Sequence, residues 1–160
     1  MSVDQELATR FLASGMTLAL AESCTGGMIA ERVTTISGCS AWFRGGIVAY
    51  HNDIKQQLLQ VPGGLLEQHG AVSEAVARAM AEGARRVIGS DLALAVTGIA
   101  GPDGGTREKP VGTVYVALAD HDGCVTERYQ FQGGRESVRR QTTEQALFLL
   151  KKRLVVPEMA

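Results

Sequence analysis

The chain has 160 residues, a length typical of one domain. A domain of this size buries about 68–70% of the surface that its unfolded chain exposes, so we expect residues 1–160 to form a single domain without a disulfide or a metal. The 16 Lys and Arg residues nearly balance the 17 Asp and Glu residues. This balance argues against a nucleic-acid-binding protein, which needs clustered basic residues in excess. A small anionic ligand is still compatible with it, because a few backbone N–H groups and one arginine can hold a phosphate.

The cysteines and the N-terminus bear on the compartment. Cys24, Cys39 and Cys124 form no Cys-x-x-Cys pair and no cluster with histidine at metal-ligand spacing, so we expect reduced thiols and no metal site. Residues 1–15 carry acidic residues early, unlike a leader peptide. No apolar run approaches the roughly 20 residues that a membrane helix needs. The sequence therefore predicts a soluble, cytoplasmic protein that does not bind a membrane.

Helical and extended patterns alternate over the first 40 residues. Apolar residues at helical spacing, bounded by a capping acid and a glycine, predict a first helix: Leu7, Phe11 and Leu12 between Asp4 and Gly15. Residues 17–21 (TLALA) predict a buried strand. It ends in the small-residue turn 22–27 (ESCTGG), and a second helix is expected to run to about Ser37.

A second strand and a short helix follow. Residues 41–50 are rich in aromatic and β-branched side chains and predict a strand, in which Gly45-Gly46 suggests a bulge. Asp53 is expected to cap a short helix that carries Lys55. Pro62, followed by two glycines, should break this helix.

The middle of the chain predicts another helix and strand. Ser73 is expected to cap a long helix over residues 74–88, ended by Gly89. Residues 91–96 (DLALAV) predict a buried strand. The glycine-rich loop 97–106 (TGIAGPDGGT) comes directly after it.

The last third of the chain decides the fold class. Residues 111–119 and 125–131 predict two strands joined by a turn at 121–123, which makes an antiparallel hairpin. A final helix of about twenty residues opens after Gly133-Gly134, and four apolar residues form much of its buried stripe: Val138, Leu147, Leu150 and Leu154. The pattern predicts an α/β fold, a three-layer α/β/α sandwich whose β-sheet is mixed.

Two loops rich in glycine, serine and threonine follow predicted strands, at 22–27 and at 97–106. Ligands of open α/β sheets bind outside the carboxyl ends of strands. In the first loop, the N–H groups of Thr25, Gly26 and Gly27 open a helix and have no acceptor within it. We therefore expect these three groups to be available to a phosphate or an oxyanion.

Ser23 is the candidate nucleophile of the first loop, although a serine at this position is also a common helix cap. Its surroundings lack the Gly-x-Ser-x-Gly spacing of the α/β-hydrolases. Cys24 is the rival nucleophile. Because neighbours on a strand point to opposite faces and unpaired cysteines are commonly buried, we expect Cys24 to be buried and favour Ser23.

A serine nucleophile needs a base, and none of the three histidines, His51, His69 and His121, has a spacing that suggests a triad. Lys55 can serve if burial or neighbouring cations lower its pKa, whereas composition alone favours an exposed surface lysine. The loop 97–106 lacks dinucleotide and P-loop spacing, and its glycines fit either close approach to a ligand or a flexible connection. Arg135, at the start of the last helix, is either an anion contact or an ordinary exposed arginine.

Five segments taken together resemble the CinA C-terminal domain family, which includes stand-alone nicotinamide mononucleotide amidases. They are ESCTGG, GGIVAYHNDIK (45–55), AVSEAVA (71–77), TGIAGPDGGT followed by KPVGTVYVALA (109–119), and GGRESVR (133–139). The resemblance covers nearly the whole chain. It implies hydrolysis of the carboxamide of nicotinamide mononucleotide to nicotinic acid mononucleotide and ammonia, in pyridine-nucleotide salvage, with no metal and no cofactor.

The resemblance also implies roles for individual residues. The family's serine nucleophile falls on Ser23, its lysine on Lys55 and its nearby tyrosine on Tyr50, which is expected to help Lys55 take a proton. The nucleotide-binding surface falls on four residues of the second loop, Thr97, Gly98, Ala100 and Gly101. Arg135 matches a basic residue that meets the phosphate.

The same resemblance favours a homodimer, and the stretch around Trp42 and Phe43 is open as either core or interface. The larger N-terminal domain of full-length family members has no counterpart in this sequence, so we expect the activity of that domain to be absent. Two other readings stay open. The chain is either a non-catalytic nucleotide-binding or regulatory module of the same fold, or an amidase for another small carboxamide.

Overall fold

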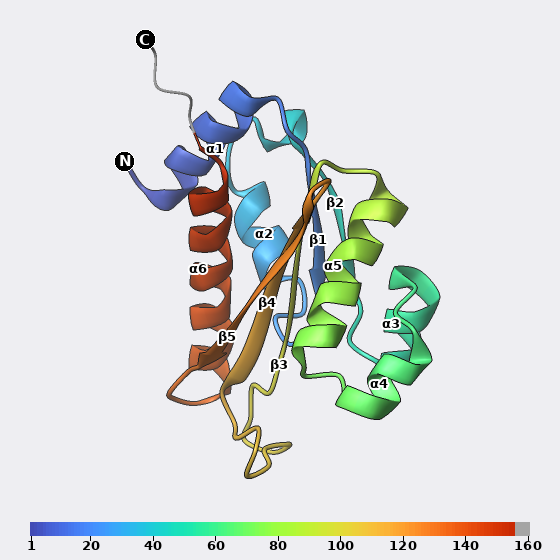
Figure 1. Ribbon diagram of the computed structural model, residues 1–160. Helices are drawn as coiled ribbons and strands as arrows, with labels where there is room; N and C mark the ends of the chain where they lie inside the picture. The colour runs from blue at the N-terminus through green and yellow to red at the C-terminus, as the bar shows by residue number, and fades with distance from the viewer. Residues whose placement is uncertain (156–160) are drawn as a thin grey trace.

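A five-stranded mixed sheet lies between two layers of helices in the computed structural model, which describes residues 1–155 (Figure 1). The strands are β1 (Leu18–Glu22), β2 (Phe43–Val48), β3 (Leu92–Gly98), β4 (Thr113–Asp120) and β5 (Gly123–Gln130), in the spatial order β2-β1-β3-β4-β5. β1 pairs in parallel with β2 and β3, whereas β4 pairs antiparallel with β3 and β5. The predicted three-layer α/β/α sandwich with a mixed sheet is confirmed.

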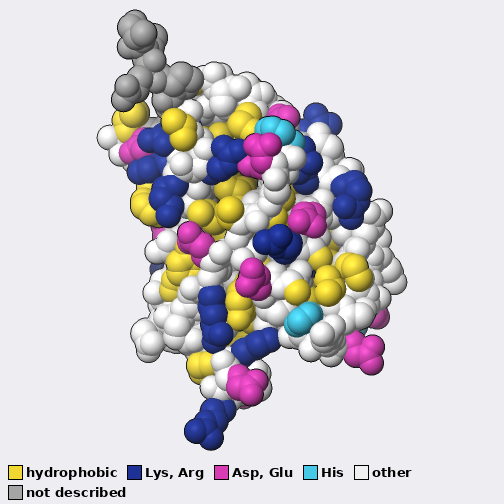
Figure 2. Space-filling view, in the orientation of Figure 1, with side chains coloured by type: hydrophobic (Ala, Val, Ile, Leu, Met, Phe, Trp, Pro, Cys, Tyr) yellow, Lys and Arg dark blue, Asp and Glu magenta, His cyan; other side chains and the backbone are white. Residues whose placement is uncertain are grey.

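Helices lie on both sides of the sheet, where α5 (Glu74–Ile88) packs on one face and α2 (Met28–Thr34) and α6 (Arg135–Arg153) on the other (Figure 1). The layer of α2 and α6 also holds α1 (Val3–Ser14). The layer of α5 also holds α3 (Asn52–Leu59) and α4 (Gly63–His69), and a short 3₁₀ turn (Cys39–Ala41) precedes β2. In the orientation of Figure 1 the space-filling view looks onto the β5 edge, where acidic and basic side chains are interspersed (Figure 2).

The two faces of the sheet differ in side-chain size. Alternate residues of a strand point to opposite faces, so Leu18 and Leu20 of β1 join one core while Ala19 and Ala21 join the other. The same face of β3 and β4 also carries alanines, namely Ala93, Ala95, Ala117 and Ala119. Small side chains let α5 lie close to the sheet, and α5 in turn holds α3 in place.

Most predicted elements are confirmed in place. Ser73 accepts a hydrogen bond from the N–H of Val76 and caps α5, which ends at Gly89 in the left-handed conformation. The pairing of β1 with β2 shifts register between Phe43 and Gly45, so the irregularity lies at Arg44, one residue before the bulge expected at Gly45-Gly46. All four residues of the expected α6 stripe are buried.

The local predictions fail at three points and miss one short helix. Leu12 is 62% exposed and is not part of the buried stripe of α1. The helix after the ESCTGG turn ends at Thr34, before Ser37. Asp53 does not cap α3; the side chain of His51 does, by accepting from the N–H of Asp53. Pro62 breaks the chain as expected but then starts α4, because a proline at a helix start loses no hydrogen bond.

The aromatic stretch before β2 belongs to the core. Trp42 is 2% exposed, and its ring stacks on that of Phe11 with 4.3 Å between ring centroids, while Phe43 is half-buried against the same cluster. Along residues 1–155, none of the helices has both the length and the apolar character needed to cross a membrane.

Candidate active site

A cleft opens where the carboxyl ends of β1, β2 and β3 meet. These three strands are parallel, so the turn after β1, the segment after β2 and the loop after β3 reach the same edge of the sheet, at the lower end of Figure 1. The cleft has a volume of about 270 Å³. Eight of the predicted site residues line it: Ser23, Tyr50, Lys55, Thr97, Gly98, Ala100, Gly101 and Arg135.

Ser23 and Lys55 are in direct contact at the floor of this cleft. Ser23 lies in the turn after β1 and Lys55 in the first turns of α3, and Lys55 Nζ is 2.9 Å from Ser23 Oγ. Lys55 is only 1% exposed and Ser23 8%. The reading of Lys55 as an ordinary surface lysine is therefore wrong, because α3 turns this side chain inward between β1 and β2.

The surroundings of Lys55 make its charged form less favourable than it is in water. Its Nζ also contacts the carbonyl oxygens of Ala49, at 2.8 Å, and Tyr50, at 3.1 Å. All three partners are uncharged, and no acidic side chain of residues 1–155 pairs with it. Burial lowers the pKa of Lys55 below its usual value of 10.5, because the charged form loses water that no carboxylate replaces.

Nζ lies within hydrogen-bond distance of three oxygens, and the charged form can donate to each of them. When Lys55 is neutral, two N–H bonds can serve the two carbonyl oxygens while the nitrogen lone pair faces Ser23 Oγ. A lysine held in this way can accept the serine proton, which is the task of a general base.

Burial makes Cys24 a poor candidate for the nucleophile. As expected it is buried, and burial raises the pKa of its thiol to about 11. The thiol is therefore protonated at neutral pH, and the thiolate is the reactive form of cysteine. Cys24 nevertheless borders the cleft beside Ser23, because residues 23–27 form a turn and no longer alternate as in a strand.

The expectation of free N–H groups at Gly26 and Gly27 is wrong. The N–H of Gly26 binds the carbonyl oxygen of Ser23, and that of Gly27 binds the carboxylate of Glu22. Thr25 is fully buried, and its hydroxyl donates to the same carboxylate at 2.6 Å. None of the three lines the cleft, since Glu22 draws this part of the turn away from it.

Tyr50 contributes two different groups. Its backbone carbonyl contacts Lys55, whereas its exposed phenol oxygen accepts a hydrogen bond from Arg135 Nη2 at 3.0 Å. Arg135 Nη1 donates to the carbonyl oxygen of Gly101 at 2.7 Å. The predicted help of the Tyr50 phenol to Lys55 is thus not what the geometry favours; the phenol joins Arg135 at the rim of the cleft.

The loop after β3 forms the opposite wall. Thr97 is buried and donates its hydroxyl to the carbonyl of Ala71, which ties the end of β3 to the start of α5. Glycine is required twice here. A Cβ at Gly98 would lie 2.6 Å from a methyl of Val114, and Gly101 has φ +89° with Val111 in the way of any side chain.

Several residues of the site were not predicted. The cleft is also lined by Cys24, Asn52, Ala71, Val72, Ile99, Asp103 and Gly104. Asn52 could have been found, because it precedes Lys55 by three residues and so shares its face of the helix. Glu22 could have been found as well, since a carboxylate at the end of an apolar strand and before a helix start is a candidate cap. No sequence feature points to Asp103, because it lies in a glycine-rich loop whose shape the sequence does not predict.

Comparison with known proteins agrees with this fold. The family model of the CinA C-terminal domain matches residues 1–154. A CinA-like protein of Geobacter sulfurreducens is 58% identical over 154 residues, which is 96% of this chain and 37% of that protein. The solved structure of the competence damage-inducible protein A of Klebsiella pneumoniae is 36% identical, with a TM-score of 0.92 over 95% of this chain and 94% of that one.

A second solved structure, a competence/damage-inducible protein of Agrobacterium tumefaciens, is 40% identical with a TM-score of 0.87, over 94% of each chain. This chain spans about 37% of the length of the Geobacter relative, so the properties of that whole protein do not transfer as such. The chain belongs to the CinA C-terminal domain family.

Proposed function

We propose that this member of the CinA C-terminal domain family is a nicotinamide mononucleotide amidase in which Ser23 is the nucleophile and Lys55 the base. The observation that carries the proposal is the buried contact of 2.9 Å between Lys55 Nζ and Ser23 Oγ. A lysine buried without a carboxylate partner is costly for a fold, and such groups gather at sites where a shifted pKa is used. The family resemblance supplies the substrate.

The reaction runs in two halves. Lys55 takes the proton of the Ser23 hydroxyl while Oγ attacks the carboxamide carbon and forms a tetrahedral intermediate. Lys55 then gives this proton to the departing nitrogen, and ammonia leaves an acyl ester on Ser23. In the second half Lys55 deprotonates a water molecule, the water attacks the ester, and nicotinic acid mononucleotide leaves as Ser23 regains its proton.

The oxyanion of the intermediate needs N–H donors. Since Gly26 and Gly27 are already bonded, the candidate is the N–H of Cys24. Cys24 borders the cleft next to Ser23, and its N–H has no backbone acceptor within residues 1–155. A single donor of this kind is worth about 2.7–4 kcal/mol.

The rim of the cleft suits the nucleotide part of the substrate. Arg135 uses one guanidinium nitrogen for Gly101 and another for Tyr50, which fixes its orientation, and it is exposed on the cleft side. A fixed guanidinium is well suited to a phosphate. The phosphate would then hold the nucleotide while the carboxamide reaches Ser23.

Ammonia release tests the proposal when measured with nicotinamide mononucleotide, nicotinamide riboside and free nicotinamide side by side. We expect turnover with the mononucleotide and much lower kcat/KM for the two compounds without phosphate. Equal rates on all three would indicate an amidase for another carboxamide. Binding of the mononucleotide without ammonia release would indicate a non-catalytic module and contradict the proposal.

A further inference from the structure

Glu22 is a buried carboxylate whose partners all belong to the turn that carries Ser23 and to the start of α2. It is 2% exposed. Oε1 accepts from the Thr25 hydroxyl at 2.6 Å, from the N–H of Gly27 at 3.2 Å and from the N–H of Ile29 at 2.9 Å, and Oε2 accepts from the N–H of Ala30 at 3.0 Å. Four donors therefore replace the water that this charge loses on burial.

Arg139 holds the same turn by its carbonyl groups. It lies on α6, and its Nε and Nη2 donate to the carbonyl oxygens of Cys24 and Thr25, each at 3.0 Å. The planar guanidinium can reach two neighbouring carbonyls at once, which a lysine ammonium cannot do with the same fixed geometry. Arg139 also follows Arg135 by one helical turn, so one segment of α6 reaches both the rim of the cleft and the turn behind Ser23.

We infer that Glu22 and Arg139 are positioning residues that fix the 23–27 turn from two sides and so keep Ser23 Oγ in reach of Lys55. The inference rests on the proposed role of Ser23 as nucleophile. Glu22 binds the donors of the turn and Arg139 its acceptors. The side chain of Ser23 itself has Lys55 as its hydrogen-bond partner within the described chain. Reaction rates depend steeply on such geometry, since a misplacement of about 1 Å can cost on the order of 10²-fold.

Glu22→Gln and Arg139→Met test the inference. Glu22→Gln keeps the shape but points an NH₂ group at N–H donors, and Arg139→Met removes both contacts to carbonyls. We expect kcat to fall at least tenfold in each, with KM changed less than twofold and the pH dependence unshifted, because Lys55 keeps its surroundings. Arg139→Lys should recover part of the lost kcat. The double variant should lose less than the product of the two losses, since both residues hold one turn.

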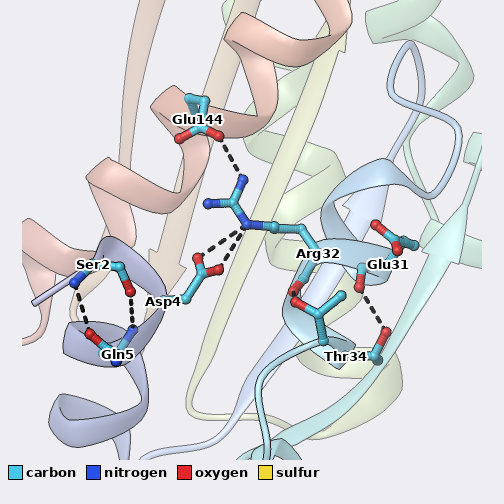
Figure 3. A network of polar contacts seen from close by, with 8 residues as sticks. Ser2, Asp4, Gln5, Glu31, Arg32, Thr34 and Glu144 are labelled. Atoms are coloured by element: carbon cyan, nitrogen blue, oxygen red, sulfur yellow. Dashed lines mark hydrogen bonds and ion pairs between the residues drawn. The ribbon is translucent and has the colours of Figure 1, made fainter.

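Two arginine variants are matched controls. Arg140 follows Arg139 on α6 but is exposed and pairs with Glu136, so Arg140→Met should leave kcat unchanged. Arg32 binds Asp4 at 3.0 Å and Glu144 at 2.6 Å, which ties α2 to α1 and α6 away from the cleft (Figure 3). Arg32→Met should lower Tm while kcat per folded molecule stays at the wild-type value.

A second readout does not depend on the substrate. A fluorophosphonate probe forms a phosphorus–oxygen bond with an activated serine and releases fluoride, so the rate of Ser23 labelling reports its reactivity directly. Glu22→Gln and Arg139→Met should be labelled at least tenfold more slowly than wild type. Labelling of wild-type Ser23 without ammonia release from the mononucleotide would refute the proposed substrate alone. Any of three results would overturn the positioning role. Both variants could be labelled at the wild-type rate, both could lose no more labelling rate than Arg32→Met does, or wild-type Ser23 could fail to be labelled.

Discussion

Lys55 is normally charged but is buried here, where a charge destabilises the fold, and this makes it the most informative single residue of the chain. Lysine is almost never fully buried unless it is paired, and here its partners are a hydroxyl and two carbonyls. The cost is understandable if the neutral amine is what the site uses. The lowered pKa of Lys55 gives that idea a measurable consequence.

The rate should rise with pH on a limb that belongs to Lys55. Below its pKa the amine is protonated and cannot accept the Ser23 proton; above it the amine is free, so kcat/KM increases with pH through this pKa. Because burial lowers the pKa, the midpoint should lie below 10.5. The measurement is kcat/KM against pH, with the exposed Lys152→Met as control, which should keep the limb. A midpoint at or above 10.5 would be inconsistent with a buried base.

Arg135 should act on binding and not on chemistry. Replacing it by methionine would remove the proposed charge-assisted hydrogen bond to the phosphate, worth about 1.5–3 kcal/mol, so KM for nicotinamide mononucleotide should rise on the order of 10–100-fold. Activity on the riboside should hardly change. Arg140→Met serves as the control on the same helix. If the mononucleotide and the riboside lose activity equally, Arg135 holds the Gly101 loop and not the phosphate.

Residue by residue, the sequence reached only part of this site. Spacing and composition alone favour a helix cap at Ser23 and a surface charge at Lys55, because the inward direction of Lys55 depends on the angle at which α3 leaves β2. The hydrogen bonds of the Gly26 and Gly27 N–H groups are equally hard to predict, since one is made to the carbonyl of Ser23 within the turn and the other to a Glu22 side chain that folds back over this turn. Family resemblance points to Ser23 and Lys55, and the fold brings Lys55 Nζ to 2.9 Å from Ser23 Oγ.

At the scale of elements, α5 is the part that fixes the position of α3. A Cβ at Gly83 of α5 would lie 1.8 Å from the carbonyl oxygen of Leu59, the last residue of α3. Gly83→Ala should therefore push the two helices apart. Overpacking of this kind costs about 1–3 kcal/mol, or roughly 2–12 °C in Tm for a domain of this size. Activity per folded molecule should fall as well, because α3 carries Lys55.

Gly64→Ala is the matched control for this prediction. Gly64 lies in α4, and no atom lies within 4 Å of the position that its Cβ would take. The Tm and the rate of ammonia release are measured for both variants. Both quantities should fall for Gly83→Ala and stay at the wild-type values for Gly64→Ala. Equal Tm values for Gly83→Ala and wild type would show that α3 and α5 can separate without cost.

Elements were more predictable than the contacts between them. The hydrophobic pattern and the residues at the ends of the segments predict α5 and β3. The two strand-like segments on either side of residues 121–123 predict the hairpin. The short α4 is not predicted from the sequence, because Pro62 and the two glycines after it are typical of a helix break, although a proline can equally start a helix. Leu12 shows the converse, since helical spacing alone does not say whether an apolar residue at the margin of a stripe is covered.

At the scale of the whole molecule, the family resemblance predicts a homodimer. β2 is an edge strand of the sheet and ends at Val48, which is 48% exposed, and an unpaired edge is a surface that proteins commonly cover. Light scattering at micromolar concentration should give twice the 17.0 kDa of one chain. A mass of one chain across the concentration range would contradict this prediction.

The central claim joins all three scales: the sheet brings two strand ends together, α3 turns Lys55 inward, and the pair opens a carboxamide. Ammonia release from nicotinamide mononucleotide by wild type, Ser23→Ala and Lys55→Met, with folding checked by circular dichroism, tests it most directly. We predict turnover by wild type, a loss of roughly 10⁴-fold or more in Ser23→Ala and of about 10²–10⁴-fold in Lys55→Met. Full activity in a folded Ser23→Ala protein would contradict the claim.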